Sequence, residues 1–400
     1  MSKNPCHIAL IGATGSVGSS VLDICRAFPE KFKIIFLVAH RNALKMNDLI
    51  HEFHPIGAAL TDREAASILR TLQSEVSVYE TDDDLEYIVT HPEIDHVVFA
   101  SSGTAAIKAL QKALLADKNV SLANKESIVV AAPWVMPLVR RTDQLRPLDS
   151  EHNAIWQCLQ GEDKETVEEI YLTASGGPFR TYDQKALRHV TPEMALAHPV
   201  WDMGYKVSID SATLMNKGIE IIEAMYLFDL EHTQVKAVIC PGSIVHGIVR
   251  FTDGTLKMAA STPDMRLAAA TALSYPGRLR LSALPQIMPL SVHSLTVQFY
   301  PPDEKLFPCL ALAKEAARKK GPYPSLLVGA DEVAVDAFLR REISFTQISL
   351  VIEQVLSSYN DNAPQTLEES LIILERGRER ARALIRSAGR CGKERKSYDR

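Results

Sequence analysis

The sequence lacks the cysteine patterns of disulfide-rich and zinc-binding proteins. Its six cysteines are widely separated, and none belongs to a Cys-x-x-Cys pair. Secreted scaffolds and structural zinc sites need closely grouped cysteines, so neither class fits. We expect these residues to be reduced thiols of an intracellular protein.

Basic charge and long apolar runs are also missing. The formal net charge is −5 with no long basic run, so nothing suggests a nucleic-acid or membrane-surface partner. No apolar run approaches the roughly 18 residues of a membrane span. Because the first apolar strand begins within a few residues of the start, we expect no signal or transit peptide. We therefore expect a cytoplasmic protein that binds neither nucleic acid nor membrane. With 400 residues, two or three domains are expected.

A glycine pattern stands at the start of the chain. Residues 7–11 (HIALI) form an apolar strand, which is followed by Gly12, Gly15 and Gly18 and then by an apolar-periodic helix. These glycines allow a tight turn, a close approach of backbone to a pyrophosphate and close packing of helix on strand. The helix N-terminus supplies free N–H groups for the phosphates. This context predicts a dinucleotide site.

The end of the second strand lacks the acidic residue that usually holds the ribose 2′-hydroxyl of NAD. Residues 33–39 form this strand, and His40, Arg41 and Asn42 follow it. An arginine there suits a 2′-phosphate, which predicts NADPH as the cofactor. A solvated loop arginine is the alternative.

Strands and helices continue to alternate up to residue 123, which predicts a doubly wound, mostly parallel sheet. Asn124, Lys125 and Glu126 follow the last strand of this series, where ligands of such sheets bind. We expect them to contact cofactor and substrate. The further strands are expected at 58–60, 76–79, 96–100 and 119–123, and the helices at 62–72, 82–90 and 103–116.

Paired carboxylates open the next part of the chain. Asp149 and Glu151 flank Ser150, and on an extended segment both carboxylates would point the same way. Such a pair suits a hard divalent cation, Mn²⁺ or Mg²⁺. Capping of the following helix by Asp149 or Ser150 explains the same residues equally well.

Two further segments point to an anionic ligand. Strand 169–173 leads into Ser175-Gly-Gly, whose hydroxyl and backbone N–H groups suit an anion, although a bare turn is the simpler reading. The loop that begins at His198 and carries Trp201 and Met203 is predicted to be a lid. A short extended piece at 208–210 and a helix at 212–227 should follow.

The predicted helix at 212–227 and the residues before it carry donors and acids. Ser211, Asn216 and Lys217 suit a phosphate. Glu220, one turn after them, is the better candidate to complete a metal site with Asp149 and Glu151, and Glu223 is expected to support it. Strands at 237–240 and 244–251 should close this domain's sheet, with His246 as a core or interface residue.

The remainder is predicted to be a proline-rich extended connection followed by a helical bundle. Helices are expected at 310–320, 330–340, 345–358 and 366–387, and a disordered tail from Cys391. The predicted fold is thus α/β, with an N-terminal Rossmann-type NADP-binding domain, a central α/β catalytic domain and a C-terminal helical bundle. The predicted NADPH-binding domain is residues 1–149, and the predicted catalytic domain is 150–274, with a lid at 197–208. A linker at 275–303, a helical domain at 304–388 and a tail at 389–400 should follow.

Together the motifs resemble the 1-deoxy-D-xylulose 5-phosphate reductoisomerase family along nearly the whole chain. The matching stretches, in the family's order, are GATGSVG, LANKES, DSEHNAIWQ, TASGGPFR, HPVWDMG, IDSATLMNKGIEIIEA, TPDMR, LFPCLALA and EVAVDAFL. The resemblance implies a homodimer that rearranges this phosphorylated sugar and reduces it with NADPH to 2-C-methyl-D-erythritol 4-phosphate, in the non-mevalonate isoprenoid pathway.

The resemblance also implies residue roles. The metal would be bound by Asp149, Glu151 and Glu220. Lys125, Glu151 and His198 are the expected catalytic residues. Substrate contacts are expected from Lys125, Ser150, Glu151, Ser175, His198, Trp201, Met203, Ser211, Asn216, Lys217 and Glu220. NADPH contacts are expected from Thr14, Gly15, Ser16, Val17, His40, Arg41, Asn42, Asn124, Glu126 and Gly204.

Some positions depart from the family pattern. The family usually has glycine where His40 stands, Asn-Ala-Ala-Asn-Glu where this chain has Gly329-Ala-Asp-Glu332, and His-Trp where it has Met225-Tyr226. None of these positions belongs to the metal set. His40 affects the fit around the 2′-phosphate.

Two other functions are compatible with the architecture. An NADP-dependent semialdehyde or sugar dehydrogenase would need no acidic metal set, and a phosphorylating aldehyde dehydrogenase would need a reactive cysteine. Cys158, the nearest candidate, lies in an apolar helix. A nucleotide-sensing module without catalysis would not need the complete set of acids and phosphate donors.

Overall fold

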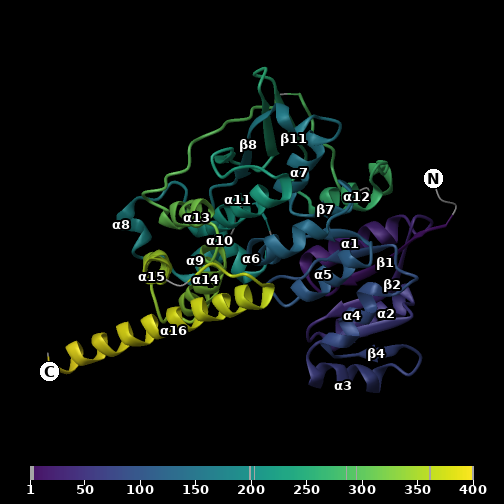
Figure 1. The fold of residues 1–400 in the computed structure, drawn as a ribbon, viewed down its shortest axis with the longest axis horizontal. Helices are drawn as coiled ribbons and strands as arrows, with labels where there is room; N and C mark the ends of the chain where they lie inside the picture. The colour runs from purple at the N-terminus through teal and green to yellow at the C-terminus, as the bar shows by residue number, and fades with distance from the viewer. Residues whose placement is uncertain are drawn as a thin grey trace. The chain divides into compact units, whose positions relative to one another are not determined.

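The computed structural model describes residues 4–197, 200–201, 203–284, 286–293, 295–359 and 362–398; for residue 281 and residues 388–398 it describes the backbone alone. The chain forms two compact units (Figure 1). The first consists of Met1–Ile128, Ala132–Gln160 and Ala259–Leu295, and the second of Val129–Ala131, Gly161–Met258 and Thr296–Arg400. The domain boundaries expected from the sequence divide the chain differently and stay predictions.

A seven-stranded sheet forms the centre of the first unit, and its paired strands are parallel. The strand order is β4-β3-β2-β1-β5-β6-β7, so the order reverses between β1 and β5. Ligands of such sheets bind at this reversal, beyond the carboxyl ends of the strands. The predicted Rossmann-type fold is confirmed. The strands are β1 (Cys6–Ile11), β2 (Phe32–Ala39), β3 (Gly57–Leu60), β4 (Ser77–Tyr79), β5 (His96–Phe99), β6 (Asn119–Leu122) and β7 (Leu145–Pro147).

Helices cover this sheet, and one of them comes from far along the chain. Ala269, Ala272 and Leu273 of α12 belong to the same apolar core as β1 and α1. The sequence analysis did not predict α12, whose core partners in β1 and α1 lie more than 200 residues away. The helices are α1 (Ser16–Ala27), α2 (Ala43–Phe53), α3 (Arg63–Leu72), α4 (Asp82–Thr90), α5 (Ile107–Leu115), α6 (Lys125–Val135), η1 (Met136–Leu138), α7 (Ser150–Leu159), α12 (Met265–Ser274) and η3 (Leu281–Ala283).

The second unit has a four-stranded sheet of order β11-β10-β8-β9. β8 pairs antiparallel with β10 and parallel with β9, which confirms a second, mixed α/β layer. Its strands are β8 (Val167–Ala174), β9 (Val235–Ile239), β10 (Val245–Phe251) and β11 (Leu256–Ala260). Its first helices are η2 (Lys164–Thr166), α8 (Gln184–Leu187), α9 (Pro192–Leu196), α10 (Tyr205–Thr213) and α11 (Met215–Phe228).

The C-terminal part of this unit is helical, as predicted, and two of its helices pack very closely. A Cβ atom on Gly329 would lie 2.3 Å from the carbonyl oxygen of Leu374, and one on Gly377 would lie 3.0 Å from that of Leu326. Only glycine allows helices to approach this far. The helices are α13 (Pro308–Lys319), α14 (Tyr323–Leu339), α15 (Phe345–Ser357) and α16 (Leu367–Tyr398).

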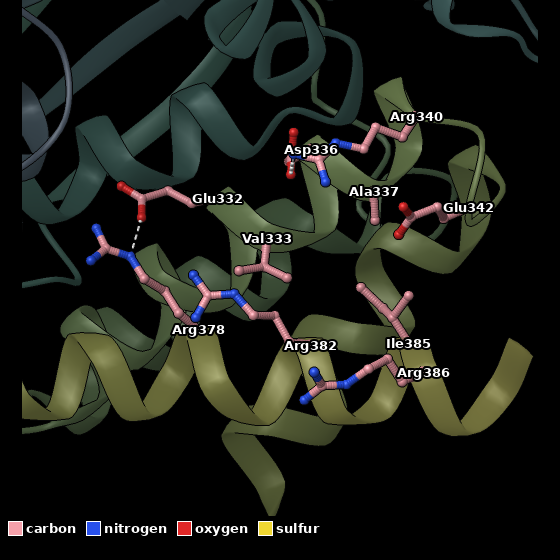
Figure 2. Close-up of a pocket in the computed structure, with 10 residues that line it drawn as sticks. All are labelled: Glu332, Val333, Asp336, Ala337, Arg340, Glu342, Arg378, Arg382, Ile385 and Arg386. Carbon is pink, nitrogen blue, oxygen red and sulfur yellow. Dashed lines mark hydrogen bonds and ion pairs between the residues drawn. The ribbon is translucent and has the colours of Figure 1, made fainter.

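A surface cavity of about 520 Å³ lies among these helices, with its lining on α14, the turn after it and α16 (Figure 2). Arg378 donates to Glu332 at 2.7 Å across the two helices, and Arg340 pairs with Asp336 at 2.8 Å. Arg378 and Arg340 of the lining are thus each paired with an acidic side chain.

Three details differ from the sequence-based expectation. Residues 208–210, expected to be extended, lie in α10. Helix α14 begins at Tyr323, earlier than residue 330. Helix α16 extends to Tyr398, where a disordered tail was predicted. By contrast, the described residues of 275–307 contain only η3 and a single bridge between Ile239 and Tyr300, as expected for an extended connection.

Across the described residues, no helix has the length and apolar character that crossing a bilayer requires.

A buried histidine in the first sheet makes stability depend on pH. His96 of β5 contacts the Ser121 hydroxyl through Nε2 at 2.8 Å. Burial, and to a smaller extent the Arg146 guanidinium, lower the pKa of His96 from 6.5 to about 3. Between these values the unfolded chain binds a proton that the folded chain does not, so stability falls as pH is lowered.

We predict that lowering the pH from 7 to 5 destabilises the wild type by about 2 kcal/mol more than the His96→Gln variant, which has no such titration. Urea unfolding at the two pH values measures this difference. Parallel losses in both proteins would contradict the assignment.

Candidate active site

The glycine loop after β1 has the geometry that its sequence predicted. Gly12 has φ +91°, and a Cβ atom there would lie 2.5 Å from the backbone nitrogen of Ser101. A Cβ atom on Gly18 would lie 2.2 Å from the carbonyl oxygen of Gly12. Gly15 precedes α1 and supplies no side-chain cap. The turn is therefore tight, and the N-cap residue makes no side-chain hydrogen bond to the first N–H groups of α1.

The residues after β2 lie at the same edge of the sheet. His40 and Arg41 are exposed, and His40 Nδ1 contacts the Thr61 hydroxyl at 2.9 Å. Asn42 caps α2 by accepting a hydrogen bond from the Lys45 backbone N–H at 3.0 Å.

Lys45 is a cation that sequence reasoning missed. Its Nζ donates to the Thr14 carbonyl and to the Ser19 hydroxyl, each at 3.1 Å, so it braces the glycine loop. Its place in the first turn of α2, after Arg41, was the available signal.

Lys125 and Glu126 begin α6, directly after Asn124. Asn124 caps the helix and accepts from the Ser127 backbone N–H at 2.9 Å. Lys125 and Glu126 are buried, at 8% and 6% exposure. Lys125 Nζ contacts Asp149 Oδ2 at 2.6 Å, so two of the predicted site residues meet here.

Asp149 is the N-cap of α7, accepting from the Glu151 backbone N–H at 3.3 Å. Glu151 therefore lies in a helical turn, and the expectation of an extended Asp-x-Glu segment is wrong. The Ser150 hydroxyl donates to Glu151 Oε2 at 2.8 Å. Capping is confirmed, but it does not exclude a metal, because Asp149 has a second oxygen.

The charge state of Asp149 suits a cation. Burial raises the pKa of this carboxyl, but the Lys125 ammonium and contact with His152 outweigh burial and hold the pKa well below its usual range. Asp149 is thus ionised at neutral pH.

In the second unit, the segment after β8 lies against α10. Gly176 and Gly177 have φ values of +87° and +68°, and a Cβ atom on Gly177 would lie 2.7 Å from the Ser211 carbonyl oxygen. The Ser175 hydroxyl accepts from the Gly177 N–H at 3.1 Å. The backbone that follows Ser175 thus lies next to Ser211, although the two serines are far apart in the sequence.

The single helix predicted over 212–227 is in fact two helices. Leu214, with φ +60°, ends α10 and begins α11. This break places Asn216 and Lys217 in the first turn of α11. Their side chains both donate to the Glu220 carboxylate.

The lid region is described in part. His198 lies outside the described residues, and residues 205–208 of the predicted lid belong to α10. Trp201 packs on His246 of β10, with ring centroids 6.3 Å apart. His246 was expected to be a core or interface residue and was left out of the site, so its contact with a predicted site residue was missed. Met203 accepts a hydrogen bond from the Ser208 hydroxyl at 3.5 Å, and Gly204 precedes α10.

Family models cover most of the chain. Residues 8–132 match the 1-deoxy-D-xylulose 5-phosphate reductoisomerase model, and residues 145–228 and 260–380 match two models of the C-terminal domains of the same enzyme. The chain belongs to the 1-deoxy-D-xylulose 5-phosphate reductoisomerase family.

Curated relatives of this family match at full length. The reductoisomerase of Desulfosudis oleivorans is 42% identical over 95% of this chain and 99% of its own length. That of Caldanaerobacter subterraneus subsp. tengcongensis is 41% identical over 93% of this chain and 97% of its own.

Solved reductoisomerase structures have the same fold. The Zymomonas mobilis enzyme in complex with NADPH matches with a TM-score of 0.87 at 35% identity, covering 96% of this chain and 99% of its own. A reductoisomerase in complex with NADPH, fosmidomycin and magnesium matches with a TM-score of 0.88 at 35% identity, covering 95% and 98%.

The glycine loop allows a matched test of its geometry. Both glycines have a positive φ, which is unfavourable for alanine. Gly12→Ala would in addition bring its Cβ atom into a clash with backbone, whereas nothing lies within 4 Å of the Cβ position of Gly103. We predict a loss of about 3 kcal/mol in stability for Gly12→Ala and about 1 kcal/mol for Gly103→Ala. Chemical denaturation measures both. Equal losses would mean that the close approach at Gly12 does not matter.

Proposed function

We propose that this family member converts 1-deoxy-D-xylulose 5-phosphate to 2-C-methyl-D-erythritol 4-phosphate, using NADPH and a divalent metal, in the non-mevalonate isoprenoid pathway. The observation that carries the proposal is the match over nearly the whole length to relatives that bear the reductoisomerase name. Similar solved reductoisomerases are named with NADPH and with magnesium. No observation favours a plain sugar dehydrogenase or a sensor.

NADPH would bind at the glycine loop of the first unit. The uncapped start of α1 offers N–H groups for the pyrophosphate, from Gly15, Ser16 and Val17, with Thr14 beside them. Arg41 and Lys45 supply positive charge for a 2′-phosphate, and His40 and Asn42 flank them. Asn124, Glu126 and Gly204 are proposed as further contacts. When bound, NADPH supplies the hydride for the reduction.

The acidic residues fit a hard divalent cation. Asp149, Glu151 and Glu220 can each offer one carboxylate oxygen, the ligand type that Mn²⁺ and Mg²⁺ prefer. We propose these three as the metal ligands, two from the start of α7 and one from α11. When bound, the ion supplies a Lewis acid for the carbonyl group of the substrate.

The substrate phosphate would be held in the second unit. Ser175 and Ser211 belong to one neighbourhood, and Asn216 and Lys217 stand one turn before Glu220. Asn216 and Lys217 now donate to that carboxylate. A cation at Glu220 would compete for its oxygens and leave both donors available to the phosphate. Metal and phosphate binding should therefore favour each other.

The remaining residues would act on the sugar itself. Lys125 and Glu151 are proposed to hold and move protons at the substrate oxygens, and Ser150 to orient Glu151 through its hydrogen bond. His198, Trp201 and Met203 are proposed to cover the substrate and exclude water.

The proposal also covers the oligomeric state of the protein and its location in the cell. We propose a homodimer, which light scattering would show as twice the chain mass of 44.2 kDa. A cytoplasmic location is proposed because the substrate and NADPH are highly charged metabolites that do not cross bilayers unaided.

The proposed activity is tested with the purified chain, 1-deoxy-D-xylulose 5-phosphate, NADPH and Mn²⁺ or Mg²⁺. We expect loss of NADPH absorbance that stops when the metal is chelated and resumes when it is restored. NADPH consumption that is insensitive to chelation would point to a dehydrogenase without a metal. No consumption at all would contradict the proposal.

The metal assignment is tested with Glu220→Gln and with the control Glu223→Gln, which changes another buried acid of α11. Glu220→Gln should lower kcat/KM at least about 100-fold, more than outer partners of a metal usually contribute. It should also weaken Mn²⁺ binding measured by calorimetry. Glu223→Gln should have a clearly smaller effect on both. Equal effects would remove Glu220 from the ligand set.

A further inference from the structure

A buried charge cluster lies outside the proposed ligand set and joins α10 to the C-terminal helices. Lys206 Nζ contacts Asp331 Oδ2 of α14 at 2.6 Å and also contacts Asp210, one turn further along α10. The Asp210 and Asp331 side chains are 3% and 0% exposed, and that of Lys206 is 27% exposed. One ammonium thus serves two buried carboxylates. The cluster belongs wholly to the second unit.

Electrostatics makes this contact specific. A buried carboxylate without a counter-charge is strongly unfavourable, so Asp331 depends on a cation. Within the described chain, Lys206 is the cation that Asp331 contacts, and Asp331 Oδ1 makes no hydrogen bond. The carboxylate of Asp331 is therefore directed at one partner, the first turn of α10.

Helix α14 is a firm support for this contact. It packs against α16 at the distance that Gly329 and Gly377 allow, so its backbone has little room to shift. Glu332, the residue after Asp331, pairs with Arg378 of α16 at 2.7 Å (Figure 2). The Asp331 carboxylate is therefore held in place by the packing of α14 against α16.

Helix α10, in contrast, is short and is flanked by irregular backbone. Gly204 starts it without a side-chain cap, and Leu214 ends it with φ +60°. Trp201 and Met203 precede it, and Ser211 lies on its last turn, against Gly177. A shift of α10 would therefore move residues proposed to contact the substrate at both of its ends.

We propose that Lys206 is a positioning residue whose link to Asp331 holds α10 in the place that sugar-phosphate binding requires. The C-terminal helices would then contribute to the active site without touching the substrate. This inference rests on the proposed function, because the role of Ser211 does.

Asp331→Leu is the sharpest test, because it cuts the link between the helices while leaving Lys206 paired with Asp210. Asp331→Asn is the matched control, since its amide oxygen still accepts a hydrogen bond from Lys206. The change removes one of the two carboxylates that share the Lys206 ammonium, so no buried charge loses its last counter-charge and Asp331→Leu should fold.

For Asp331→Leu we expect an unchanged or higher melting temperature together with a KM for the sugar phosphate raised about 10-fold or more. The Kd of NADPH, measured by fluorescence titration, should change less than about twofold, because its proposed site lies mainly in the other unit. Asp331→Asn should keep a KM close to the wild type. A purely structural role would lower stability and activity together.

Hydrogen exchange of α10 provides a readout that needs no turnover. Its amides should exchange faster in Asp331→Leu and in Lys206→Met than in the wild type and in Asp331→Asn. If the wild type fails to turn over the sugar phosphate, the proposed function fails while exchange still tests the link. Wild-type KM and wild-type exchange in folded Asp331→Leu would overturn the inference, as would an equal impairment in Asp331→Asn.

Discussion

The proposed ligand-binding residues depend on carboxylates that are largely removed from water and paired with lysines. Glu220 is fully buried beside Lys217, and Asp149 contacts Lys125 at 2.6 Å. Removing either charge from water is unfavourable unless an opposite charge stands beside it. The chain therefore carries its own cations where a divalent ion is proposed to bind. A divalent ion bound to the carboxylates would leave those lysines available to an anionic substrate.

Many of the residues proposed to bind ligands lie at helix starts. Gly15 opens α1, Asn124 caps α6 and Asp149 caps α7, and each of these helices begins beyond a strand of the first sheet. In the second unit, Asn216 and Lys217 lie in the first turn of α11. Helix starts present free N–H groups and a partial positive charge, so they favour phosphates and carboxylates alike. Helix starts therefore suit both the phosphates of the proposed ligands and the carboxylates proposed to hold the metal.

The sequence predicted those parts of the structure that depend on backbone geometry and on the periodicity of neighbouring residues. The glycine turn at Gly12 and the strand–helix alternation follow from backbone geometry and periodicity, and both are observed. The Asp149 pattern stayed ambiguous because a helix cap and a metal ligand use the same residue type. The break at Leu214 could not be predicted, since a leucine rarely adopts a positive φ.

Long-range contacts were the other limit. Helix α12 joins the first core, His246 meets Trp201, and Asp331 reaches Lys206 across more than a hundred residues. No periodicity or motif encodes which distant segments will meet. The role proposed for Lys206 could therefore arise only from the folded chain.

The central claim is that the chain rearranges the carbon skeleton before reducing it, and proton NMR of the product tests this directly. Incubation with 1-deoxy-D-xylulose 5-phosphate, NADPH and Mn²⁺, with the metal removed before the spectrum is recorded, should replace the methyl-ketone singlet of the substrate with a new methyl singlet further upfield. The new signal stays a singlet because the methyl group of a branched product sits on an alcohol carbon without hydrogen. A methyl doublet would show simple reduction of the ketone and would contradict the account.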